Sequence, residues 1–171
     1  MSISKKRALT AGVMMATAMA VTFTACKKDD NNDGPAPRTE SYALKGVGAD
    51  AAATNATVTM TENRDSSINL SIKLSKSTKD AKQYIYVIGG TPAQPGTDTL
   101  AAISGDNIKG TGAAMNINIF QNVKTIKVTT PAGQKDTAFR YADVLKYAAH
   151  LKVLTGDKKD TLAIGTIGKK N

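Results

Sequence analysis

The sequence of 171 residues has no tryptophan, one histidine and one cysteine. Zinc and copper sites need grouped His, Cys, Asp or Glu ligands, and the first two are too scarce here to supply them. A catalytic triad would need His150 as its base, yet no serine stands in a nucleophile-elbow setting such as Gly-x-Ser-x-Gly. We therefore expect no metal site and no cofactor, and we expect His150 to lie at the end of a helix.

Glutamate is also scarce, because Glu40 and Glu62 are the two in the chain. Most glycosidases place two carboxyl groups on either side of the bond that they cleave. Glu40 lies beside a polar segment and Glu62 is expected in a hairpin loop, so neither suggests a buried acid with a raised pKa. We assign no catalytic residue and predict a protein that is not an enzyme.

Positive charge predominates, with 23 Lys and Arg against 14 Asp and Glu and a formal net charge of +9. Most of the lysines stand singly in predicted strands and turns. A nucleic-acid surface would combine a clustered basic stripe with stacking aromatics. Since three phenylalanines and no tryptophan are present, we expect no nucleic-acid partner.

The first 25 residues have the organisation of a secretory signal peptide, with a basic start at 5–7 and an apolar stretch over 8–23. The apolar stretch is interrupted by threonines and a glycine. It therefore falls short of the roughly 20 clean apolar residues that a transmembrane helix needs. We predict that residues 1–25 are removed, which lowers the formal charge to +6 because three basic residues leave with them.

The segment Phe23-Thr24-Ala25-Cys26 resembles a lipobox, the site where lipoprotein signal peptidase cuts before a lipid-bearing cysteine. Phe23 stands where leucine is usual. A lone thiol in an exported chain is expected to be paired, reactive or modified. We predict lipidation of Cys26, and two acyl chains suffice for stable anchoring at about 0.8 kcal/mol per buried methylene. The alternative is an ordinary cleaved signal that leaves a free thiol.

Residues 26–40 are polar, lack apolar periodicity and are expected to form a flexible tether. The order Cys26-Lys27-Lys28-Asp29-Asp30 resembles the lysine-plus-acidic export signal of bacteria that display lipoproteins on the cell surface. This resemblance implies a protein of the outer membrane, anchored by lipid and facing the cell exterior.

From residue 41 to 171, apolar and polar residues alternate with period two, as in strands that have one buried face. The pattern predicts strands at 56–61, 68–75, 83–88, 99–103, 115–119, 125–129, 151–154 and 161–167. The first two should form a hairpin through the loop 62–67, and 83–88 should be central or covered on both sides because both its faces are apolar.

A turn at 121–122 should join the strands on either side of it, a loop should cover 131–135, and a short helix should span residues 138–149. Seven to nine short strands with one helix predict a single mainly β domain. We expect an antiparallel β-sandwich of immunoglobulin-like or Greek-key type.

The chain resembles a divergent CHRD domain, the β-sandwich module named for chordin. The resembling segments are 42–46, 55–60, 68–74, 138–149, 151–153 and 163–168. Where that family usually carries Ala-His-Ile-His, this chain has Gln83-Tyr84-Ile85-Tyr86, so no metal role is carried over. The family has no well-defined activity, and the resemblance therefore implies a fold rather than a function.

Three threonines follow an aspartate and precede an apolar residue, namely Thr99, Thr137 and Thr161. This pattern resembles the acceptor for periplasmic O-glycosylation in the same bacterial group as the export signal. The alternative is that Asp-Thr simply begins strands and caps helices.

Two hypotheses for function follow. The first is a non-catalytic surface lipoprotein that binds or scaffolds envelope proteins or glycans, with Tyr84 and Tyr86 as a stacking surface, although two tyrosines on one strand also suit a core. The second is an enzyme or accessory subunit acting on extracellular glycans, with carboxylates among Asp98, Asp106 and Asp143 converging in a cleft.

Overall fold

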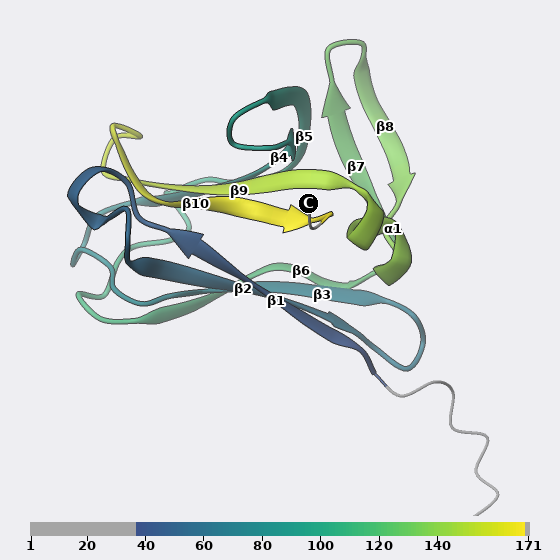
Figure 1. Cartoon of the computed structure of the whole chain (residues 1–171), viewed down its shortest axis with the longest axis horizontal. Helices are drawn as coiled ribbons and strands as arrows, with labels where there is room; N and C mark the ends of the chain where they lie inside the picture. Colours follow the sequence, from purple (N-terminus) through teal and green to yellow (C-terminus); the bar gives the residue numbers. More distant parts are fainter. Residues whose placement is uncertain (1–36, 170–171) are drawn as a thin grey trace, which may run out of the picture. The chain divides into compact units, whose positions relative to one another are not determined.

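A computed structural model describes residues 37–169, which form ten strands, one 3-10 turn and one short helix (Figure 1). The strands are β1 (Thr39–Lys45), β2 (Thr54–Glu62), β3 (Ile68–Leu74), β4 (Gln83–Gly90), β5 (Pro95–Ile103), β6 (Met115–Val123), β7 (Thr125–Thr130), β8 (Gly133–Ala138), β9 (Ala148–Thr155) and β10 (Asp160–Gly168). The helical elements are η1 (Gly48–Asp50) and α1 (Tyr141–Lys146). The predicted signal peptide, Cys26 and most of the predicted tether lie outside the described residues.

All ten strands belong to one antiparallel sheet in the order β6-β3-β2-β1-β10-β9-β4-β5-β7-β8. β1 pairs with β2 along its whole length, whereas its register with β10 joins the single Cα pair Lys45 and Ile164. The sheet curls at this narrow junction. In Figure 1, β1, β2, β3 and β6 lie below, and β4, β9 and β10 lie above them.

The two halves of the curled sheet share one hydrophobic core. Val58 and Ile72 reach it from one half, Ile85 and Leu151 from the other, and all four are fully buried. Burial of such a side chain contributes about 1.5–3 kcal/mol. The prediction of a mainly β fold is confirmed.

The alternation of apolar and polar residues predicted the positions of strands best where one face of the strand is buried. β2 and β3 form the predicted antiparallel hairpin, in register from Ala56 and Leu74 to Glu62 and Ile68. β4 lies between β9 and β5, as its two apolar faces predicted.

The predicted pairing across residues 121–122 was wrong. β6 continues to Val123 and pairs with β3, whereas β7 pairs with β8 and β5. The predicted loop at 131–135 was also wrong in part, because Gly133 begins β8. Every residue of β8 is exposed, so this strand has no apolar alternation and raises the strand count above the expected seven to nine.

The helix predicted over residues 138–149 is shorter than expected, since α1 spans Tyr141–Lys146. Ala138 is the last residue of β8 and Ala149 belongs to β9. In the sequence, apolar residues of β8 and β9 stand at helical spacing from the apolar residues of α1. They therefore made the predicted helix longer than α1 is. Among residues 37–169, none of the helical elements has the length and hydropathy to span a membrane.

An ion pair between Arg38 and Glu62, here called the clamp, lies just before the first residue of β1. Arg38 donates hydrogen bonds from Nε and Nη2 to the two carboxylate oxygens of Glu62, at 2.6 and 3.0 Å, and its guanidinium carbon lies 4.4 Å from the centre of the Tyr141 ring. The hydrogen bond from Arg38 lowers the pKa of the Glu62 carboxyl. Glu62 was expected in a hairpin loop, but it is the last residue of β2 and is 8% exposed.

Candidate functional site

A pocket of about 340 Å³ lies between the β7–β8 hairpin, helix α1, and strands β4, β5, β9 and β10. Its wall is mainly apolar and includes Val87, Leu100, Ile126, Val128, Val144 and Ile167. Its polar lining residues are Asp98, Thr130, Lys135, Thr137, Asp143 and Tyr147. Pockets of small-molecule sites have this composition, with an apolar wall and a few polar groups that fix orientation.

The β7–β8 hairpin creates the space. Ile126 and Val128 alternate along β7 and point their buried side chains toward the pocket. β7 is in register with β5 at the single pair Thr99 and Thr129, so the hairpin diverges from β5 (Figure 1). Full pairing would bring the side chains of both strands into contact, whereas divergence leaves a gap between their apolar faces.

The end of α1 is fixed at the rim of the pocket by the last residues of β10. The backbone N–H of Tyr147 donates to the carbonyls of Asp143 and Val144 at 3.0 and 3.2 Å. The N–H of Lys169 donates to the carbonyl of Tyr147 at 3.1 Å. Gly168, with φ +81°, allows this close approach because a side chain would overlap the carbonyl oxygens of Tyr147 and Val144.

The Tyr147 hydroxyl and the Asp98 side chain both lie close to Gly89. A Cβ atom at Gly89 would lie 2.8 Å from the Tyr147 hydroxyl oxygen and 3.5 Å from Cβ of Asp98. Burial, and then the negative charge of Asp98, raises the pKa of Tyr147. The phenol therefore keeps its proton at neutral pH and can donate a hydrogen bond as well as accept one.

The charged groups at the pocket form no ion pairs among residues 37–169. The carboxylates of Asp98 and Asp143 and the ammonium of Lys135 take part in no hydrogen bond or ion pair there. Asp98 is half-buried, whereas Asp143 and Lys135 are exposed. A carboxylate beside an apolar wall that forms no ion pair or hydrogen bond with the protein is a natural contact for a ligand with a positive charge or a hydrogen-bond donor.

Two of the three carboxylates considered from sequence meet at this pocket. Asp98 comes from β5 and Asp143 from α1. Asp106 lies elsewhere, where it accepts hydrogen bonds from Lys82 at 2.5 Å and Ser104 at 3.3 Å. The pair with Lys82 lowers the pKa of Asp106.

The predicted stacking residues Tyr84 and Tyr86 are not among the residues that line the pocket. They project from the face of β4 opposite to Ile85 and Val87, which are in the core. Tyr84 is 9% exposed and is covered by Lys158, whose ammonium lies 5.0 Å from the ring centre. Tyr86 is half-buried, so it offers the larger part of any stacking surface on this face.

The three candidate glycosylation threonines lie within strands. Thr137 is exposed on β8 and lines the pocket, whereas Thr99 on β5 and Thr161 on β10 are half-buried. Of their preceding aspartates, Asp160 begins a strand, as the alternative explanation supposed. A glycan on Thr137 would stand at the pocket.

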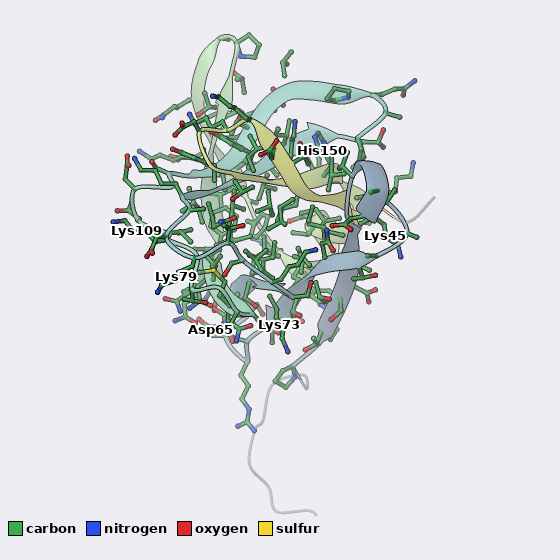
Figure 2. All side chains as sticks on the ribbon, turned by 90° about the vertical axis from the view of Figure 1, so that its left-hand side faces the viewer. Lys45, Asp65, Lys73, Lys79, Lys109 and His150 are labelled. Atoms are coloured by element: carbon green, nitrogen blue, oxygen red, sulfur yellow. The ribbon has the colours of Figure 1, made fainter. Side chains whose placement is uncertain are left out.

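His150 is not at a helix end, because the segment after Tyr147 is a strand. It lies inside β9, is 3% exposed, and its Nδ1 lies 3.0 Å from the carbonyl oxygen of Gly90. Figure 2 shows it set among strands, whereas Lys45 and Lys73 project as exposed side chains from other strands. Among residues 37–169, no three His, Cys, Asp or Glu residues are grouped as metal ligands.

Sequence reasoning did not identify Tyr147, Lys135 or the apolar wall as parts of a site. The alternation of Ile126 and Val128 was visible, but the pocket depends on the divergence of the hairpin from β5, which no local pattern encodes. Tyr147 stood inside the predicted helix and so had no reason to be singled out.

Comparisons of the chain with protein-family models, with curated proteins and with solved structures find no match.

Proposed function

We propose that this chain is a lipid-anchored protein of the outer membrane, facing the cell exterior, whose β domain binds a small and largely apolar ligand without changing it chemically. The apolar pocket beside α1 carries the proposal. Its volume of about 340 Å³ lies at the small end of the range of ligand sites, roughly 300–1,000 Å³. A single ligand of modest size would fill it.

The proposed fold is a β-sandwich of the CHRD type. Supporting this is the facing arrangement of two groups of strands, β6-β3-β2-β1 and β10-β9-β4-β5, which contribute to one core. The pocket borders this core, because its apolar lining residues, such as Val87, Val128 and Ile167, belong to the core.

The proposed anchor is lipid on Cys26, after cleavage behind Ala25. Mass spectrometry of the full chain purified from bacterial membranes should show a mature protein that begins at Cys26 and carries acyl chains. Cys26→Ser should remain soluble or keep its leader. Digestion of the wild-type protein by protease added to intact cells would support surface display, and an unmodified thiol would contradict the anchor.

O-glycosylation at Thr99, Thr137 and Thr161 is proposed on the Asp-Thr pattern, with Thr137 the most accessible of the three. Glycopeptide mass spectrometry of material from a surface-displaying bacterium should find a glycan at Thr137 that is absent from Thr137→Val. A bare threonine peptide at all three positions would contradict this proposal.

Ligand binding can be tested with 3-phenylpropanol, a neutral probe with an apolar body, and the full-length protein in lipid nanodiscs. Methyl NMR should show shifts at Leu100 and Val128, which line the pocket. Ala138→Trp should abolish these shifts, because Ala138 lines the pocket from β8. Gln134→Trp is the matched control, since Gln134 is an exposed residue of the same strand and does not line the pocket.

Three outcomes of this test are informative. Shifts that disappear with Ala138→Trp and persist with Gln134→Trp support binding in the pocket. Shifts that survive both substitutions, or shifts spread over the whole core, would contradict it. Thermal melts of both variants check that each remains folded.

The second candidate is an enzyme acting on extracellular glycans, and the observation that favours it is the presence of Asp98 and Asp143 at one pocket. Sugars need a polar surface with many hydrogen bonds, and this wall is mainly apolar. Release of reducing ends from extracellular polysaccharide that is lost in both Asp98→Asn and Asp143→Asn would favour the enzyme over the binding protein.

A further inference from the structure

We propose that the ligand of this pocket is a small apolar cation, a hydrocarbon or aromatic body with one ammonium group that lies against Asp98. This inference rests on the proposed function. It adds the charge of the ligand and the side chain that its charged group contacts.

The Asp98 carboxylate forms no ion pair or hydrogen bond among residues 37–169. The residue is half-buried and lies beside apolar wall residues. Placing a carboxylate in such surroundings costs free energy unless a partner compensates the lost hydration. A ligand ammonium compensates it through a charge-assisted hydrogen bond, which is about twice as strong as a neutral one.

The Tyr147 hydroxyl is a second possible acceptor for a ligand ammonium. It shares the space above Gly89 with the Asp98 side chain, and the negative charge of Asp98 contributes to raising the pKa of the Tyr147 phenol. An ammonium group carries up to three donors and therefore needs more than one acceptor. A carboxylate beside a hydroxyl oxygen provides two kinds of acceptor for one such group.

The charges of the pocket lining favour a cationic ligand over an anionic one. The described lining has two carboxylates, Asp98 and Asp143, against the single ammonium of Lys135. A ligand carboxylate would meet this excess of like charge, and repulsion of this kind selects against the wrong ligand. The apolar wall in turn selects against ammonium compounds that have no apolar body.

The experiment compares three probes with the same body, namely 3-phenylpropylamine, 3-phenylpropanol and 3-phenylpropanoate, at neutral pH. The protein is the full chain in nanodiscs, and affinity is read from the methyl shifts of Leu100 and Val128. The amine should bind roughly tenfold more tightly than the alcohol, the gain expected of a charge-assisted hydrogen bond. The carboxylate should bind more weakly than the alcohol.

Substitution then locates the charge effect. Asp98→Asn should lower the affinity for the amine roughly tenfold, so that amine and alcohol bind the variant about equally. Asp157→Asn is the matched control, because Asp157 is an exposed carboxylate in the β9–β10 turn and does not line the pocket. It should leave all three affinities unchanged.

The outcomes separate this inference from the proposed function. Equal affinity for amine and alcohol, or tighter binding of the carboxylate through Lys135, would overturn the cation and leave the apolar pocket standing. Absence of pocket methyl shifts with every probe would overturn the proposed function as well. Should Asp98→Asn fail to fold, the comparison of three probes on the unaltered protein still decides between these outcomes.

Discussion

Replacing Gly168 with alanine tests whether the end of β10 holds α1 in place. Gly168 has φ +81°, and a Cβ atom there would overlap the carbonyl oxygens of Tyr147 and Val144. Both oxygens are backbone atoms of the helix end, so they cannot swing aside as a long side chain would. The substitution must therefore move β10 and the end of α1 apart, or distort them.

Gly156→Ala is a matched control for the magnitude. Gly156 has φ +65° and open space where a Cβ atom would lie. Left-handed backbone costs a non-glycine residue about 1–2 kcal/mol, and the stiffer unfolded chain offsets about 0.4–1 kcal/mol of this. We expect Gly156→Ala to lower the free energy of unfolding by about 0–1.6 kcal/mol.

Gly168→Ala shares this backbone cost and adds the steric overlap. Forcing extra atoms into a packed site costs about 1–3 kcal/mol, which is the expected difference between the two variants. At about 4 °C per kcal/mol for a domain of this size, Gly168→Ala should melt about 4–12 °C below Gly156→Ala. Thermal unfolding followed by circular dichroism measures the difference.

The same pair of variants has a local readout at the pocket. Gly168→Ala should shift the methyl resonances of Val144, which lines the pocket, whereas Gly156→Ala should not. Equal melting temperatures for the two variants would refute the reasoning, because they would show that β10 and α1 separate without cost.

Three further predictions concern acid stability, the core and the rim of the pocket. Hydrogen bonds from Ser67 lower the pKa of the Asp65 carboxyl to about 2. The ionised carboxylate therefore stabilises the fold above the ordinary pKa of aspartate, and this stabilisation is lost as pH falls toward 2. In thermal melts between about pH 5 and 2, the melting temperature of Asp65→Asn should fall less than that of the unaltered protein. Ile85→Ala should lower the free energy of unfolding by about 2–5 kcal/mol in urea titrations, since Ile85 is fully buried. Gly89→Ala should displace the Tyr147 hydroxyl and weaken amine binding with little change in melting temperature, because a side-chain end yields more easily than backbone.

The strands that sequence reasoning located correctly have at least one buried apolar face. Val58 on β2 and Ile72 on β3 alternate with polar residues, and this period is visible because the core lies on one side of the hairpin. β8 lacks such a signal, since both of its faces are exposed. The pairing of β6 with β3 could not be predicted either, because it joins residues far apart in the chain.

The sequence indicated two of the three charged residues at the candidate site, but neither Lys135 nor the geometry of the pocket. Asp98 and Asp143 were considered as carboxylates of one cleft, and the structure brings both to the pocket. Asp106 stood on the same footing in the sequence but pairs with Lys82 instead. Only the path of the chain through β5, β7, β8 and α1 decides which of these residues meet.

The clamp between Arg38 and Glu62 has a mechanical consequence. Any pull on the residues before Arg38 acts along β1, and β1 is hydrogen-bonded to β2 along its whole length. Such a force loads the backbone hydrogen bonds between β1 and β2 in shear, all at the same time, so they do not break one after another. The start of the domain would therefore resist a force of the kind that the proposed lipid anchor would transmit.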